Sequence, residues 1–438
     1  MPVAEPGPRL GDDLLITDIG QLVDPGEGET SAPLHVTPDA FIWIREGRVA
    51  ARGAAADLPE AARSAPRLDA GGAVALPGLV DSHTHAVFGA TREHEFEERL
   101  AGATYQAIAA RGGGIAFSVR DLRQRSEDDL VWLAAPRLAA FPRWGVTTVE
   151  VKSGYGLNTE NELKMLRAVR RLAGDPSLPR LVPTFLGAHA VPAEFARDRA
   201  AYVRLVCDEM LPAVTSEGLA RFCDVFCEEG AFTPRESETI LARAAELGLG
   251  LKLHAEEFSR SGGVAVAVRL GATSADHLIA IDEEGIAALA ASSTVATLLP
   301  GTSFFLRLDR HAPGRALADA GAVIALATDF NPGSSMTQNL LLMAVFGCCA
   351  LGLTVDEVLR AVTRGGARAL GEGDRGTLAE GAAGDVALYD VPDYRHLIYH
   401  YGIEHCRATV RGGRVLWSRE GASVAQRHTT ASCPPASP

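Results

Sequence analysis

Short apolar runs alternate with amphipathic segments through the middle of the chain. The amphipathic segments repeat apolar residues every three to four positions and predict helices at residues 158–174, 234–248, 262–271 and 282–292. The apolar runs predict eight buried strands, at residues 75–85, 145–156, 180–190, 222–232, 249–258, 272–278, 293–301 and 322–333. Eight strands separated by helices are typical of a (β/α)8 TIM barrel, so we predict an α/β fold of this class.

The two ends of the chain follow a different pattern. Short strand-like segments with turns fill residues 13–75, and the same style returns at residues 384–392 and 407–421. The sequences REGRV (45–49) and RGGRV (411–415) are typical of tight hairpin turns. Both ends are therefore predicted to contribute strands to one small β region.

These patterns divide the chain into a barrel and a small β-sandwich-like domain. We assign residues 1–75 and 376–421 to the small domain and residues 76–375 to the barrel. Residues 89–145 form a long insertion after the first barrel strand, and a connection of that length usually has a function. Residues 422–438 are rich in Ser, Thr, Ala and Pro and predict a disordered tail.

Composition and charge restrict the possible partners. Of the 438 residues, 47% are hydrophobic and 22% are charged, which are ordinary values for a globular protein. The formal net charge of −13 argues against nucleic acid, because phosphate binding requires clustered Lys and Arg. No apolar run approaches the ~20 residues that cross a bilayer, so we expect no membrane partner. An anionic small-molecule substrate must be captured by local groups.

The cysteines and the first residues bear on the compartment. The seven cysteines include no CxxC pair, and the start, MPVAEPGPRLGDD, lacks the basic patch and apolar run of a secretory leader. We therefore expect a cytoplasmic protein with free thiols. For the assembly we expect a homodimer, because twofold assemblies are the commonest.

Histidines and one aspartate mark the ends of the predicted strands. His83 and His85 close the first strand, and residues i and i+2 share one face of a strand, so both imidazoles should project into the barrel mouth. Other strands end at His189, His254, His277 and Asp329. Active sites of TIM barrels lie at this end of the strands. A single histidine is often an ordinary core residue, but five of them with an acid on one rim favour a metal site.

The candidate metal ligands are three neutral nitrogens and one carboxylate, from His83, His85, His254 and Asp329. This set suits one Zn or Fe ion with an open position for water, whose pKa falls to about 7 on such an ion. Glu257, three residues after His254, and His277 are placed to move protons and to stabilise charge. We count Glu257, His277 and Asp329 as the catalytic groups.

Two lysines on predicted barrel strands require separate attention. Lys152 and Lys252 are candidates for carbamylation, which in some barrels of this type lets a lysine bridge two metal ions. The bridging lysine usually comes from the fourth strand, and here that strand (222–232) contains none. We therefore expect one metal ion per chain.

The same positions resemble the amidohydrolase superfamily, with HxH on the first strand, His on the fifth and sixth, and Asp on the eighth. Within it, the chain resembles the imidazolonepropionase family over nearly its whole length. The segments that carry this resemblance are FGATREHEFEERLAGATYQAIAARGGGI, VEVKSGYGLNTENELKMLR, PTFLGAHAVP, HAEEFS and ATDFNPGSS. The resemblance implies a hydrolase of histidine degradation that opens 4-imidazolone-5-propanoate to N-formimino-L-glutamate, by attack of metal-bound hydroxide on the ring carbonyl carbon.

The resemblance also implies roles around the substrate. Arg92 corresponds to a guanidinium that clamps the propionate carboxylate, and a bidentate Arg suits that planar anion better than Lys. Substrate contacts are further implied for Tyr155, His189, Glu257, Asn331, Gly333 and Ser334, and for Tyr105 in the insertion. Two positions depart from the family pattern: Glu256 stands where Asp is expected, with its side chain predicted to point away from the mouth, and His405 stands where Asn is expected.

Two other functions remain open at this point. A purine or pyrimidine deaminase of the same superfamily would use the same histidines, Glu257 and Asp329, but a neutral nucleobase gives no reason for Arg92 beside the ligands. A non-catalytic barrel that serves as an assembly module belongs to another class. Such relatives usually lose metal ligands, whereas this chain retains the full set.

Overall fold

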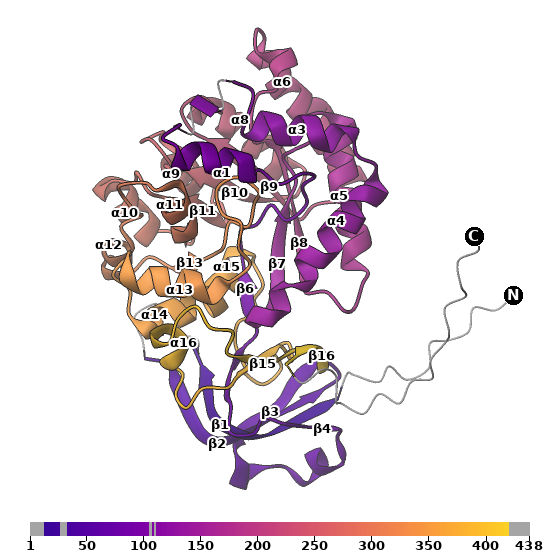
Figure 1. Cartoon of the computed structure of the whole chain (residues 1–438), viewed down its shortest axis with the longest axis vertical. Helices are drawn as coiled ribbons and strands as arrows, with labels where there is room; N and C mark the ends of the chain where they lie inside the picture. Colours follow the sequence, from indigo (N-terminus) through magenta and orange to yellow (C-terminus); the bar gives the residue numbers. More distant parts are fainter. Residues whose placement is uncertain (1–12, 27–32, 105–106, 109–110, 420–438) are drawn as a thin grey trace, which may run out of the picture.

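The structure, a computed structural model, describes residues 13–26, 33–104, 107–108 and 111–419 (Figure 1). The predicted tail and Tyr105 therefore lie outside the described residues. Figure 1 shows a barrel surrounded by helices in the upper part of the molecule and a separate sheet below it. The two parts correspond to the predicted barrel and to the predicted β region made from both chain ends.

The barrel is an eight-stranded parallel sheet in the order β13-β12-β11-β10-β9-β8-β7-β6. Its strands are β6 (Leu79–Asp81), β7 (Val146–Lys152), β8 (Arg180–Ala188), β9 (Phe222–Cys227), β10 (Gly250–Ala255), β11 (Ser274–His277), β12 (Val295–Leu298) and β13 (Ile324–Leu326). Nearly all of their residues are buried, as expected for parallel strands that are covered on both faces. The predicted TIM barrel is confirmed.

The first predicted strand is divided between the two sheets. Its beginning is β5 (Val74–Pro77), which pairs with β1 and β14 of the small sheet, and only β6 belongs to the barrel. The sequence shows one apolar run because both pieces are buried. Beyond β6 the backbone stays extended and bonds to the segment after β13. The amide of Asp329 donates to the His83 carbonyl (3.0 Å) and the amide of His85 donates to the Phe330 carbonyl (2.9 Å). These bonds close the barrel at its mouth.

Helices cover the outside of the barrel. The four helices predicted between strands are α5 (Thr159–Ala173), α8 (Pro234–Glu246), α9 (Gly263–Arg269) and α10 (Glu283–Ala290), all confirmed. Helix α8 begins at a capping box in which Thr233 and Glu236 satisfy each other's amides, which fixes its start. The remaining α-helices outside the insertion are α6 (Arg199–Leu205), α7 (Leu211–Ser216), α11 (Pro300–Leu306), α12 (Gly314–Asp319), α13 (Leu340–Cys349), α14 (Val355–Arg360), α15 (Gly366–Ala369) and α16 (His396–Tyr399).

The insertion after β6 is largely helical. It contains α1 (Glu93–Leu100), α3 (Ile115–Gln124) and α4 (Glu127–Ala139). The predicted amphipathic helix is α4, which begins at a capping box formed by Ser126 and Asp129. Figure 1 shows α1 and α3 across the upper end of the barrel, above the carboxyl ends of the strands. The insertion is thus positioned over the barrel mouth.

The small sheet runs in the order β16-β15-β14-β5-β1-β2-β3, and β4 also pairs with β1. Its strands are β1 (Leu14–Asp24), β2 (His35–Arg45), β3 (Arg48–Ala54), β4 (Arg67–Asp69), β5, β14 (Val386–Tyr389), β15 (Cys406–Arg411) and β16 (Arg414–Ser418). Both predicted hairpins are present, joining β2 to β3 and β15 to β16. Two strands predicted at residues 32–38 and 40–45 form the single strand β2, in which Asp39 adopts a positive φ of 44°.

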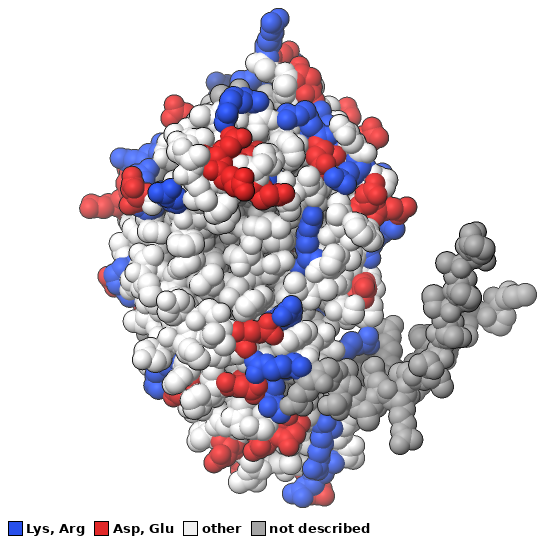
Figure 2. All heavy atoms as spheres, in the orientation of Figure 1, with Lys and Arg blue, Asp and Glu red and all other residues white. Residues whose placement is uncertain are grey.

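Two features of the described residues bear on possible partners. Within the described part of the chain, no helix is long and apolar enough to cross a membrane. Figure 2 shows acidic and basic side chains mixed at both ends of the face in view, with a broad uncharged band between them. That face therefore carries no extended basic surface of the kind that binds nucleic acid.

Gly145 sits where the barrel meets the small sheet, between a short 3-10 turn and β7. Its φ is 85°, and an added Cβ would overlap the hydroxyl of Tyr389, which donates to the Trp144 carbonyl at 3.0 Å. Gly248 has nearly the same φ, 82°, but no heavy atom within 4 Å of such a Cβ. Gly248→Ala should therefore cost only backbone strain, about 1 kcal/mol. Gly145→Ala should add overpacking and cost about 2–4 kcal/mol, measured by urea unfolding. Equal costs would contradict the tight contact at Tyr389.

Candidate metal centre and active site

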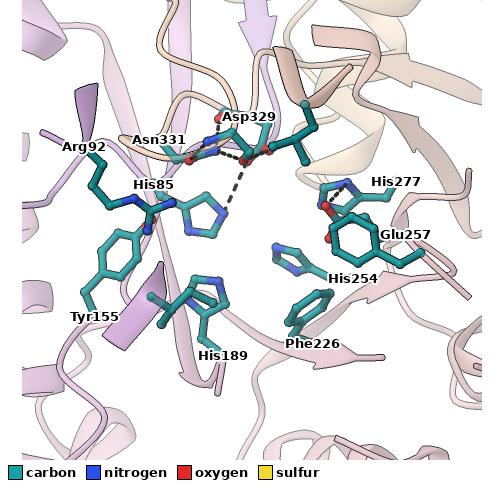
Figure 3. A pocket seen from close by; sticks show the side chains of 14 residues that line it. His85, Arg92, Tyr155, His189, Phe226, His254, Glu257, His277, Asp329 and Asn331 are labelled. Carbon is teal, nitrogen blue, oxygen red and sulfur yellow. Dashed lines mark hydrogen bonds and ion pairs between the residues drawn. The ribbon is translucent and has the colours of Figure 1, made fainter. Parts of the chain in front are cut away.

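A pocket lies at the carboxyl ends of the barrel strands, under the insertion (Figure 3). Figure 3 shows Arg92 and Tyr155 on one side, Glu257 and His277 on the opposite side, and the His85 and His254 rings between them. The other lining residues are Ile115, His189, Phe226, Phe258, Leu306, Asp329, Asn331 and Ser334. The structure therefore brings nearly all the predicted site residues of the described chain to one cavity.

Four side chains form a donor set for a metal ion. Donor atoms of His83, His85 and His254 lie within 4.8 Å of one another. The Nε2 atoms of His83 and His85 are 3.6 and 3.5 Å from Oδ1 of Asp329. Among the described residues, Nε2 of His83 and Nε2 of His254 are buried without a hydrogen-bond partner. A buried polar atom without a partner costs free energy, so these nitrogens fit a site whose partner is a cation.

Carboxylates hold the other nitrogen of two of these histidines. Nδ1 of His83 lies 2.6 Å from Oδ2 of Asp276, and Nδ1 of His254 lies 3.0 Å from Oδ1 of Asp224. A carboxylate on Nδ1 keeps the proton there and directs the Nε2 lone pair toward the donor cluster. Oδ2 of Asp329 accepts hydrogen bonds in the same way, from Thr302 Oγ1 at 2.6 Å and Ser334 Oγ at 3.4 Å.

A buried charge network lies directly below the donors. The Lys152 ammonium is 2.6 Å from Asp224, 2.9 Å from Glu150 and 3.8 Å from Asp276. Lys252 lies 3.5 Å from Glu150 and 3.8 Å from Asp276. Burial opposes the charge of Lys152, but the carboxylates outweigh it and raise its pKa above the ordinary value. A carbamate at Lys152 would add a further negative charge to these three acids, so the network supports a single metal ion.

Burial sets the protonation of the groups in the pocket. It lowers the pKa of His83, His85 and His277 well below the usual range, so these imidazoles are neutral and their lone pairs are free for a cation. Burial raises the pKa of Asp329 to about 6, although the hydrogen bond from Thr302 acts to lower that pKa. Burial, with the charges of Asp329 and Glu228, raises the pKa of Glu257 well above its ordinary value.

Glu257 and His277 face each other beside the donor cluster. Oε1 of Glu257 lies 3.7 Å from Nδ1 of His277. The loop that carries Glu257 is held by Glu228, which accepts hydrogen bonds from the amides of Phe258 (2.9 Å) and Ser259 (3.3 Å). Glu256 points away from the pocket, as predicted, and accepts the amides of residues 262 and 264. A carboxyl with a raised pKa beside a neutral imidazole is suited to proton transfer.

Arg92 is a buried cation at the start of α1. Its Nε lies 3.2 Å from Glu95 Oε2, and its Nη1 lies 3.4 Å from Ser118 Oγ. Gly333 packs directly on the guanidinium, because a Cβ at residue 333 would overlap its Nη2. Glycine at position 333 therefore leaves the space that the Arg92 side chain occupies at the pocket wall.

Tyr155 and His189 form the aromatic floor of the pocket. His189 stacks on His85, with ring centroids 5.2 Å apart and an interplanar angle of 14°, and Tyr155 lies 5.4 Å from His189. Burial lowers the pKa of His189 to about 3, so the ring is neutral. Its Nδ1 donates to the Gly154 carbonyl at 2.9 Å, which leaves Nε2 as an acceptor.

The turn after Asp329 is organised by Asn331. Its Oδ1 accepts the amides of Gly333 and Ser334, both at 2.8 Å, and its Nδ2 donates to the Asp329 carbonyl at 2.6 Å. A ligand carboxylate at this turn would have to share or replace these bonds. The contacts implied for these three residues stay predictions.

Sequence reasoning did not single out the acids that support the histidines. Asp224 and Asp276 lie inside strands β9 and β11, and Thr302 lies at the start of α11. The available signal was an acid placed within an otherwise apolar strand, which requires a buried partner. Predicted Tyr105 lies outside the described residues.

Comparison with known proteins agrees with this geometry. The family model described as "Amidohydrolase family" matches residues 115–417. An imidazolonepropionase from Bacillus velezensis is 42% identical over 418 residues, covering 94% of this chain and 99% of the relative. Imidazolonepropionases from Myxococcus xanthus and Cupriavidus taiwanensis are both 48% identical, covering 86% and 87% of this chain and 90% and 92% of the relatives.

Solved structures share the fold at much lower identity. A triazine hydrolase variant aligns with a TM-score of 0.73 at 21% identity, covering 93% of this chain and 95% of that one. A guanine deaminase from C. acetobutylicum aligns with a TM-score of 0.66 at 14% identity, covering 92% and 100%. These likenesses concern the fold alone. Because the sequence relatives match almost end to end and the family model covers most of the barrel, the chain belongs to the imidazolonepropionase family of amidohydrolases.

Proposed function

We propose that this chain hydrolyses 4-imidazolone-5-propanoate to N-formimino-L-glutamate in histidine degradation. Its relatives carry the name of this activity. The observation that carries the proposal is the position of Arg92, whose buried guanidinium lines the same pocket as His85, His254 and Asp329. A small ring that bears a carboxylate suits a pocket with a guanidinium at one end and a metal donor set at the other.

We propose that one Zn or Fe ion is held by His83, His85, His254 and Asp329. Three nitrogens and one oxygen accept either metal, and the two partnerless Nε2 atoms support the fit. When bound, such an ion polarises a carbonyl oxygen and lowers the pKa of water to about 7. The neutral state of His83 and His85, whose pKa values are lowered by burial, favours coordination.

Glu257 and His277 carry the proton transfer in this proposal. Hydrolysis leaves the water oxygen on the ring carbonyl carbon and requires a proton on the departing nitrogen. Glu257 takes a proton from the attacking water and delivers it to that nitrogen; burial and the neighbouring carboxylates raise its pKa above the ordinary carboxyl value, which helps it to hold the proton between the two steps. His277 orients the water and stabilises the charge that develops on the carbonyl oxygen.

The remaining pocket residues orient the substrate. Arg92 binds the propionate carboxylate, and Tyr155 and His189 pack against the ring, with His189 Nε2 as a hydrogen-bond acceptor. The turn of Asn331, Gly333 and Ser334 contacts the carboxylate that forms on ring opening. Separation of Arg92 from Glu257 across the pocket supports this orientation (Figure 3).

We also propose that the chain works as a homodimer in the cytoplasm. The first part rests on the frequency of twofold assemblies, and the second on the odd count of seven cysteines, which suits a reducing compartment.

The function is tested with purified protein, 4-imidazolone-5-propanoate, guanine and cytosine. We expect ring opening of the first and no ammonia release from the others. Glu257→Gln is the matched control, because it keeps the size of the side chain and the metal donors while removing the proton carrier. Its kcat should fall about 10²- to 10⁴-fold with the metal content unchanged. Ammonia release from a nucleobase would reject the proposal, and metal loss in Glu257→Gln would make Glu257 a ligand.

Arg92→Ala should raise KM for the propionate substrate by about 10- to 100-fold, because it removes a charged hydrogen-bond donor from a buried pocket. Arg120→Ala is the control: Arg120 lies in the same insertion but is exposed and donates to the Gly112 carbonyl. For the carboxamide analogue of the substrate, KM should change little when Arg92 is replaced. An unchanged KM for the propionate substrate, or an equal rise in KM for the carboxamide, would contradict the binding of the carboxylate by Arg92.

Lys152→Met should weaken metal binding about 10- to 100-fold, because the buried carboxylates of Asp224 and Asp276, which hold the rings of His254 and His83, then lose their positively charged neighbour. The measurement is competition for Zn²⁺ with a chromophoric chelator. Lys164→Met is the control, since Lys164 donates to carbonyls of the insertion, away from the donors. Asp276→Asn tests the same contact with little change in shape. Unchanged metal affinity in both Lys152→Met and Asp276→Asn would contradict the supporting role.

A further inference from the structure

A second cavity, of about 450 Å³, lies at the opposite end of the barrel from the pocket. It is bounded by the amino end of β8, the end of α5 and the small sheet. Its charged lining residues are Arg180, Arg375, Asp385, Arg411 and Arg414. Four of these are arginines and only one is acidic, in a chain whose formal net charge is −13.

The two hairpin turns recognised in the sequence meet at this cavity. Gly47 and Gly412 both have positive φ, 74° and 55°, as two-residue hairpin turns require. A Cβ on Gly47 would lie 3.7 Å from the Gly412 carbonyl oxygen, so the turns lie side by side. The second turn places Arg411 and Arg414 at the cavity, and Figure 1 shows its strands, β15 and β16, on the side of the small sheet next to the barrel.

The acids near the cavity are already engaged. Glu372 lies 3.0 Å from Arg180 and 3.4 Å from Arg375. Asp385 pairs with Arg375 and accepts the amide of Gly412 at 2.9 Å. The carboxylates of Glu372 and Asp385 are therefore already paired with Arg180 and Arg375.

Arg411 and Arg414 have no carboxylate partner of this kind. Within the described ranges, the Arg411 side chain donates one hydrogen bond, to the Pro176 carbonyl at 3.2 Å, and the Arg414 side chain makes no hydrogen bond or ion pair; their backbones pair with each other in the β15–β16 hairpin. Burial lowers the pKa of Arg411, and the neighbouring charges of Arg375, Arg414 and Arg180 lower it further, against the attraction of Asp385. The guanidinium groups of these four arginines thus repel one another, and all four line the same cavity.

We propose that this cavity binds a small multivalent oxyanion of the phosphate class, bridging Arg180 and Arg375 of the barrel end to Arg411 and Arg414 of the small sheet. A multivalent oxyanion offers several acceptor oxygens and enough charge for more than one guanidinium, and planar Arg groups bind such anions bidentately. The site is separate from the pocket because it lies at the amino ends of the strands. A bound anion there joins the small sheet to the barrel and stabilises the folded chain.

The test is calorimetric titration of the metal-loaded protein with orthophosphate and pyrophosphate, at constant ionic strength set with chloride. We expect saturable binding below about 1 mM and a rise in Tm with the anion. Arg411→Gln/Arg414→Gln should weaken binding at least 10-fold and abolish the rise in Tm, while turnover stays unchanged. Arg45→Gln/Arg63→Gln is the charge-matched control, because both arginines are exposed on the small domain outside the cavity.

Each of the following outcomes overturns the proposal: no saturable binding, equal binding in wild type and Arg411→Gln/Arg414→Gln, or loss of binding in Arg92→Ala, which would assign the anion to the pocket. Should the double variant not fold, Arg414→Gln alone is used, since Arg414 supports no other described contact. Comparison of phosphate with sulfate separates recognition of charge from recognition of the phosphoryl group. If neither anion binds more tightly than chloride, the site is also overturned.

Discussion

The site depends on one buried ammonium group. Lys152 lies fully buried between Asp224 and Glu150, and Asp224 in turn holds the ring of His254. Charges of this kind are tolerated in a core only when each is paired, and removal of one partner leaves the others unpaired at a high cost in free energy. The histidines are therefore oriented by electrostatics one layer beneath the donor atoms.

The choice of lysine for this position has a physical reason. The chain contains 42 Lys and Arg residues, of which only three are lysines, so 42 − 3 = 39 are arginines. Two of the three, Lys152 and Lys252, stand in the network under the donors. A compact ammonium presents its donors to acids on several strands, whereas a guanidinium presents its donors in one fixed plane.

Much of the fold was predictable from the sequence. Parallel strands that are buried on both faces appear as short apolar runs, and the helices that cover them repeat an apolar residue every three to four positions. The split of the first strand at Gly78 could not be predicted from the sequence, because β5 and β6 are both apolar and only their pairing partners distinguish them. The candidate donors could be selected because His83, His85, His254 and Asp329 stand at the ends of apolar runs, and their coordination of a metal ion stays a prediction. The supporting acids were missed because their meaning depends on which strands become neighbours, and that information is not local.

Arg92 and Ile115 come from the insertion, whereas the metal donors come from the strands and the segment that closes the barrel. Part of the pocket wall is thus encoded by a stretch of chain separate from the strand ends, although Tyr155, His189 and Asn331 also line the pocket from segments that follow barrel strands. Replacement of one excursion between two strands would therefore reshape that part of the wall and leave the cluster of His83, His85, His254 and Asp329 in place.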